Sequence, residues 1–107
     1  MITLKEIKAN KGATLNANGE AITYKTGFQV SRKDLFICRI NQLRMRDIKA
    51  ILADMPSTAN LGIWIDGGRA YVDMSERISN YKHALKVGRD RKQISVWSWN
   101  KGEAVTC

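Results

Sequence analysis

The sequence predicts an α+β fold: a mostly antiparallel β-sheet of about five to seven strands packed against two main helices plus a short N-terminal helix. Three observations predict it. Short alternating apolar segments are separated by turn residues, a Gly67-Gly68 pair joins two of them, and two longer stretches have helical periodicity. The 107 residues are 44% hydrophobic and 26% charged, which suits one domain over residues 1–107 with its own core.

The N-terminus carries a helix-start signal. Thr3 followed by Glu6 has the capping-box spacing, in which each side chain bonds the other's backbone amide. The pattern predicts a short helix over about 4–11, with Gly12 as its left-handed end.

Extended segments follow this helix. Asn18-Gly19 supplies the positive φ values of a type I′ turn and predicts a hairpin, while the polar run 31–34 predicts a break between two later segments. We therefore expect extended pieces at 14–15, 21–24, 27–30 and 35–40.

The first main helix is expected over about 43–54, capped by Asn41 and stopped by Pro56. Its apolar positions fall on one stripe: Met45, Ile48, Ile51, Leu52 and Met55.

The next element is a hairpin around Gly67-Gly68. A two-residue turn there places Trp64 opposite Tyr71 and Asp66 opposite Arg69. The other face then carries the pairs Ile63–Val72 and Ile65–Ala70.

A second main helix, capped by Ser75 or Ser79, is expected to run to about residue 92. Its stripe of Tyr81, Ala84, Leu85 and Gly88 faces the core, where Gly88 permits close approach to the sheet. A strand over 93–99 follows, with Ile94 and Val96 on one face and Ser95, Trp97 and Trp99 on the other, then a turn and a short strand over 103–106.

Positive charge is concentrated in two segments. The net charge is +8, and residues 32–49 and 81–92 each hold a net +4. Such clusters favour nucleic acid or an acidic, nucleic-acid-binding host protein as partner, although a charge that only maintains solubility is the alternative. The candidate binding residues, with two nearby indoles, are Lys82, Lys86, Arg89, Arg91, Lys92, Arg44, Arg46, Lys49, Trp97 and Trp99.

Catalysis is poorly supported. His83 is the single histidine, and the hairpin register separates Asp66 from Asp73 by roughly 13 Å, too far to share a proton or a metal ion. The two cysteines, Cys38 and Cys107, are expected to be a buried thiol and an exposed terminal one rather than a disulfide. We expect no enzyme activity, no cofactor and no metal.

The aromatic residues of the strands allow two interpretations. If the two strand groups are neighbours, one sheet face carries Trp64, Tyr71, Trp97 and Trp99. These rings then either pack beneath a helix as core, or stay exposed beside the basic helix for base stacking or protein contact.

Neither a signal peptide nor an apolar run of membrane-spanning length is found, so we expect a cytoplasmic protein with no membrane partner.

Several stretches resemble a group of short uncharacterised proteins encoded by phages, prophages and integrative elements of Gram-positive bacteria. The stretches are Asn18-Gly19-Glu20, Gly27 to Ser31, Gly62 to Ser75, Ala84 to Arg89 and Gln93 to Trp97. The resemblance implies a mobile-element accessory protein and transfers no catalytic residues. Such proteins often bind nucleic acid or inhibit host defence, as anti-CRISPR proteins do. We therefore expect a small basic non-enzymatic protein acting on nucleic acid; the alternative is an anti-defence inhibitor of a host nuclease complex.

Overall fold

The structure, a computed structural model, describes residues 1–107. Six strands form one antiparallel sheet in the order β1-β3-β4-β2-β5-β6, which confirms the α+β prediction. The elements are α1 Leu4–Ala9, β1 Gly12–Leu15, β2 Phe28–Arg39, the 3₁₀ turn η1 Ile40–Gln42, α2 Met45–Asp54, β3 Asn60–Asp66, β4 Arg69–Ile78, α3 Tyr81–Asp90, β5 Ser95–Ser98 and β6 Glu103–Thr106.

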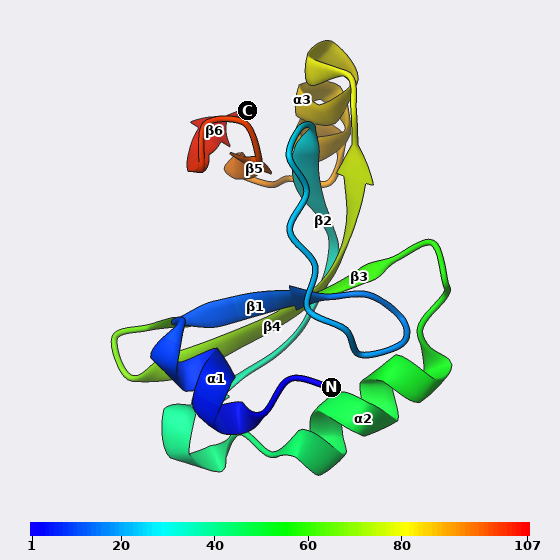
Figure 1. The fold of residues 1–107 in the computed structure, drawn as a ribbon. Coiled ribbons are helices and arrows are strands. Elements are labelled where there is room, and N and C mark those ends of the chain that lie inside the picture. The colour runs from blue at the N-terminus through cyan, green and yellow to red at the C-terminus, as the bar shows by residue number, and fades with distance from the viewer.

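The two long strands, β2 and β4, extend from one end of the molecule to the other and connect the two parts of the sheet (Figure 1). At one end α1 and α2 lie against the part of the sheet formed by β1, β3 and β4. At the other end α3 packs near β5 and β6. The sheet curls between these ends, so the helices flank different parts of it.

Two apolar clusters of unequal size hold the helices on the sheet. The larger contains 11 buried residues, among them Ile7 of α1, Ile48 of α2 and Val72 of β4. The smaller contains only Val30, Ala84 and Val96 as fully buried members.

Both clusters lie on the same face of the sheet. Along β4 alternate residues point to opposite faces, and Val72 and Ile78 both belong to the helix-covered side. Odd-numbered β4 residues, from Arg69 to Arg77, therefore point to the other face, which carries no helix.

Three of the local signals in the sequence are confirmed. The Thr3–Glu6 capping box forms, with the Glu6 amide donating to Thr3 Oγ1 at 3.2 Å. The β3–β4 register places Trp64 opposite Tyr71 and Asp66 opposite Arg69, as the Gly67-Gly68 turn predicts. Burial of Ile48 and Leu52 confirms the apolar stripe of α2.

The N-terminal hairpin is confirmed only as a short antiparallel pairing, in which the Asn16 amide donates to the Glu20 carbonyl and the Ile22 amide donates to the Thr14 carbonyl. β1 pairs with β3, and residues 21–24 contribute only an isolated bridge between Leu15 and Ala21. Asn16 Oδ1 accepts from the amides of Asn18 and Glu20, at 3.0 Å each, and so forms a wider turn than a two-residue type I′ turn.

The predicted end of α1 is also corrected. The helix ends at Ala9, and Lys11 is the left-handed residue, at φ 59°. Gly12 instead starts β1, where an added Cβ would lie 2.5 Å from the Ile63 carbonyl oxygen. Close strand approach, not helix termination, requires this glycine.

A single twelve-residue strand, β2, replaces the two pieces expected on either side of residues 31–34. β-bulges at 31–33 and 34–36 keep the polar run within the strand and bend it. Residues 40–42 then form η1, so Asn41 does not cap α2; Arg44 is its N-cap and supplies no side-chain bond.

The start of α3 differs from both proposed caps. β4 continues to Ile78 and buries Ser75, and Asn80 caps the helix by accepting from the His83 amide at 2.9 Å. Gly88 does permit close approach, since an added Cβ would lie 3.0 Å from Val96 Cγ1. Ile94 does not share the side of Val96, because it precedes β5 and is 86% exposed.

Candidate binding surfaces

The described chain contains no group of three or more His, Cys, Asp or Glu side chains that could hold a metal ion. The thiols of Cys38 and Cys107 are both free, and both residues are half-buried. His83 is exposed on α3. None of the helices has the length and apolar content to cross a membrane. The features that remain are surfaces rather than enclosed sites.

The outer face of α3 carries the first set of predicted residues. Lys82, Lys86 and Arg89 are spaced by four and three residues and are all exposed, on the side opposite buried Ala84. Lys86 pairs with Asp90 at 2.8 Å, and its hydrogen bond lowers the pKa of that carboxyl. Lys82 and Arg89 form no ion pair and project freely.

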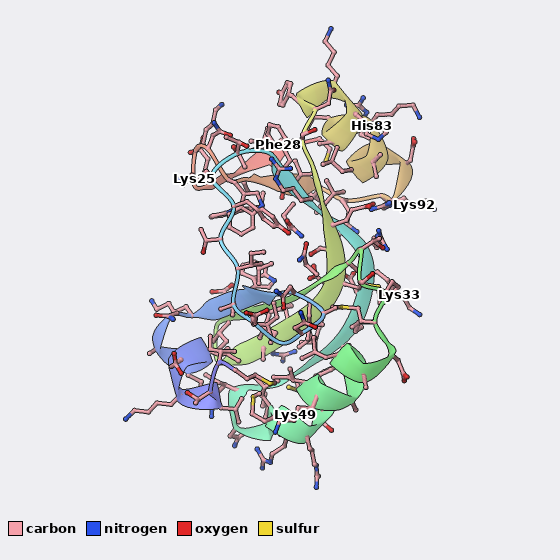
Figure 2. All side chains as sticks on the ribbon, turned by 45° about the vertical axis from the view of Figure 1, so that its right-hand side comes forward. Lys25, Phe28, Lys33, Lys49, His83 and Lys92 are labelled. Atoms are coloured by element: carbon pink, nitrogen blue, oxygen red, sulfur yellow. The ribbon has the colours of Figure 1, made fainter.

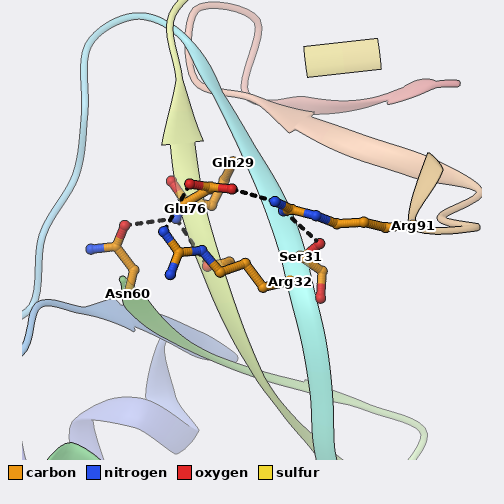
Figure 3. A network of polar contacts seen from close by, with 7 residues as sticks. Gln29, Ser31, Arg32, Asn60, Glu76 and Arg91 are labelled. Carbon is orange, nitrogen blue, oxygen red and sulfur yellow. Dashed lines mark hydrogen bonds and ion pairs between the residues drawn. The ribbon is translucent and has the colours of Figure 1, made fainter. Parts of the chain in front are cut away.

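Arg91, just after α3, has a structural role. Its guanidinium pairs with Glu76 at 2.6 Å and donates to the Ser31 carbonyl at 3.3 Å (Figure 3). Arg32 pairs with the other oxygen of Glu76 at 2.9 Å. Hydrogen bonds from Arg32, which have the larger effect, and from Arg91 lower the pKa of the Glu76 carboxyl, although burial opposes this shift. This network fastens the end of α3 to β2 and β4; Lys92, the next residue, is exposed.

The α2 candidates lie far from those of α3. Figure 2 shows Lys49 at the end of the molecule opposite His83 and Lys92. Arg46 and Lys49 are exposed, but Arg44 folds back and donates to the carbonyls of Asn41 and Leu43. The candidates on α2 therefore do not form one continuous patch with those on α3, although Arg32 of the first basic segment meets Arg91 of the second at Glu76.

The four aromatic residues of the strands do share one sheet face. Trp64 pairs with Tyr71, and Gln29 pairs with both Arg77 and Trp97, so β4 connects both groups through its odd-numbered positions. This is the helix-free face, so the rings do not pack beneath a helix. They also lie away from α3, because Val96 points to that helix and Trp97 points the other way.

These rings differ in exposure. Trp64 is 57% exposed and Trp97 is 42% exposed. Trp99 is half-buried: its ring meets Tyr24 edge-on at 5.5 Å, and its Nε1 donates to Gln29 Oε1 at 3.1 Å. Trp99 is thus a packing residue, while Trp64 and Trp97 offer free ring surface.

One half-buried carboxyl, Asp73, lies on the same face. It packs directly over the backbone of Gly62, where any Cβ would collide with it. Burial raises the pKa of Asp73 to about 6, and the nearby Asp34 carboxylate adds to the rise. The buried Ser31 hydroxyl offsets part of it although it forms no hydrogen bond of good geometry.

No protein-family model, curated protein or solved structure matches this chain. The geometry alone therefore distinguishes the candidate surfaces. The sequence allowed Trp64 and Tyr71 either a core or a stacking role without placing them among the candidate binding residues, and it predicted no binding role for Asp73. Along the hairpin these residues alternate with Ile63 and Val72, which places them on the opposite face of the sheet. No local pattern showed that helices leave this face uncovered.

Proposed function

We propose that this protein is a small, non-enzymatic, nucleic-acid-binding protein of a phage or other mobile element. One observation carries the proposal: Lys82 and Arg89 project from the same exposed side of α3, and neither forms an ion pair. Free cations at this spacing can release the counterions of a phosphate backbone, which is the main source of non-specific affinity. The net charge of +8 adds long-range attraction.

Fluorescence anisotropy with labelled single- and double-stranded 20-mers tests the proposal. Affinity should fall steeply between about 50 and 200 mM salt. The double variant Lys82→Gln/Arg89→Gln should weaken binding and reduce the salt slope by about 2. The control Lys5→Gln/Lys8→Gln removes the same charge from exposed positions of α1 and should change both quantities less. No binding at about 50 mM salt would overturn the proposal.

A second candidate is an anti-defence inhibitor that binds a host nuclease complex. Exposed Trp97 favours it, since tryptophan is a common anchor of protein interfaces. Phage plating on hosts with defined defence systems, together with pull-down from host lysate, tests it. Inhibition that is lost in Trp97→Ala but retained in Lys82→Gln/Arg89→Gln would support this candidate over direct nucleic-acid binding.

A further inference from the structure

Three parallel rows of side chains cross the helix-free face at its hairpin end. The register aligns each row over β3, β4 and β2. From the hairpin turn inward, the rows are Asp66–Arg69–Arg39, then Trp64–Tyr71–Ile37, then Gly62–Asp73–Asp34.

The middle row is an exposed apolar platform. Trp64 is 57% exposed, and Ile37, on β2 where this strand is the edge of the sheet, is 58% exposed, so two large apolar side chains of one row face solvent. The rings of Trp64 and Tyr71 pack with centroids 5.4 Å apart and an interplanar angle of 39°. This arrangement holds the indole in place and leaves ring surface free for a planar ligand.

The row nearest the turn supplies free positive charge. Arg39 and Arg69 are both exposed, and neither guanidinium forms an ion pair or a side-chain hydrogen bond. Asp66 is the register partner of Arg69, yet no ion pair forms between them. Two unpaired guanidinium groups beside an aromatic platform suit a phosphate.

The inner row supplies hydrogen-bond acceptors. Asp73 is held over the backbone of Gly62, next to Trp64 along β3. Asp34 on β2 is the register partner of Asp73 on β4. These carboxylates repel phosphate, but they can accept from the exocyclic amine at the edge of a nucleobase.

The row nearest the turn is net positive, with two arginines and one aspartate; the aromatic row and then the carboxylate row follow it. A nucleotide has the matching order of phosphate, base plane and amine-bearing base edge. We propose that this surface binds a nucleotide of single-stranded nucleic acid, with an amine-bearing base on Trp64 and Tyr71, its phosphate at Arg39 and Arg69, and its amine at Asp73. The inference rests on the proposed nucleic-acid binding. It specifies a single strand because base faces are free to stack on protein only outside a duplex.

Twelve-residue oligomers of rC and rU provide the test, because their bases differ chiefly in an amine on C and a carbonyl on U. Anisotropy titrations should show rC binding about tenfold tighter than rU, and both tighter than a duplex of the same length. Trp64→Ala should weaken both single strands by roughly 5- to 100-fold. Ile94→Ala is the control: it removes another exposed apolar side chain, outside the strands, and should leave both affinities unchanged.

The variant Asp73→Asn tests base recognition without disturbing the fold. The side chain keeps its shape, so circular dichroism should be unchanged, while the preference for rC over rU should fall to near unity. Equal binding of rC and rU by the unmodified protein would overturn the assignment to Asp73.

The remaining outcomes separate the inference from the proposed function. Duplex binding that Trp64→Ala leaves unchanged would overturn the inference and keep nucleic-acid binding. Absence of binding to any oligomer would overturn both. Oligomerisation abolished by Trp64→Ala, with no oligomer bound, would show instead that the apolar row is a protein interface.

Discussion

The end of the molecule formed by α1, α2, β1 and β3 buries 11 residues in one apolar cluster, whereas the end formed by α3, β5 and β6 buries only three. Hydrophobic burial is the main stabilising term in folding, so the first end should form the stable unit of the chain. The second end depends more on polar contacts.

Polar side chains join the two ends on both faces of the sheet. On the helix-covered face Glu76 pairs with Arg32 and Arg91. On the other face Gln29 Nε2 donates to Asn60 Oδ1 at 2.8 Å and to Ser75 Oγ at 2.9 Å (Figure 3). Where β2 bends, ion pairs and hydrogen bonds of side-chain amides thus take the place of apolar packing. Regions with few buried contacts open at lower free energy, so α3, β5 and β6 should exchange their amides first.

The largest expected effect comes from the larger cluster. Leu61→Ala removes a fully buried side chain and should lower the free energy of unfolding by about 2–5 kcal/mol. Urea denaturation followed by circular dichroism measures this loss, and hydrogen exchange should accelerate in all elements. Val96→Ala in the smaller cluster should cost less and accelerate exchange mainly in α3, β5 and β6. Equal effects of the two variants would contradict the inequality of the two ends.

Glu76→Gln should cost about 2–3 kcal/mol, because it removes the partner charge of both Arg32 and Arg91. Faster exchange in α3 with β3 unchanged would locate the loss at the junction. The pKa of Glu76 is lowered in the folded state, so its contribution is present above its unfolded value of about 4.5 and is lost as pH falls through the lowered folded value. Uniform destabilisation of β3 and α3 would instead show that the two ends unfold together.

The ionised Asp73 carboxylate should destabilise the fold, whereas the Glu76 carboxylate stabilises it, although Asp73 lies at the end with the larger apolar cluster. Burial raises its folded pKa to about 6, so the protonated form is favoured and stability declines as pH rises from about 4 to 6. Asp73→Asn removes this penalty and should stabilise the protein by on the order of 1–2 kcal/mol at pH 7.5. Urea midpoints measured from pH 4 to 8 should show the gain shrinking toward pH 4. A gain independent of pH would contradict the assignment of the penalty to ionisation.

The same contrast explains which parts of the fold are predictable from sequence. The Thr3–Glu6 cap and the β3–β4 register depend on residues close in sequence, and both are confirmed. The pairing of β1 with β3 and the bent β2 depend on distant partners, which no local pattern reveals. Ser31 to Asp34 are polar because they lie at the junction between the clusters, and a polar run of this kind is easily interpreted as a loop.

The candidate surfaces follow the same rule. The cations of α3 are visible as a helical pattern, and the structure leaves Lys82 and Arg89 free as that pattern suggests. Arg91 and Arg44 belong to the same basic segments and look equally free in the sequence. In the structure, however, the Arg91 guanidinium pairs with Glu76 and the Arg44 guanidinium donates to backbone carbonyls. The exposure of the aromatic face cannot be predicted from the sequence, because it depends on where all three helices pack in the tertiary structure.

The smallest effect is expected at Gly88, where α3 meets β5 and the C-terminus. An added Cβ would lie 2.6 Å from Cys107 Sγ and 3.0 Å from Val96 Cγ1. Alanine gains about 1 kcal/mol in helix propensity, which opposes this crowding, so Gly88→Ala should change stability by about 1 kcal/mol or less. Deleting Cys107 should relieve part of the crowding and make Gly88→Ala stabilising. If the deletion leaves the effect of Gly88→Ala unchanged, Val96 rather than the terminal thiol limits how closely α3 approaches the sheet.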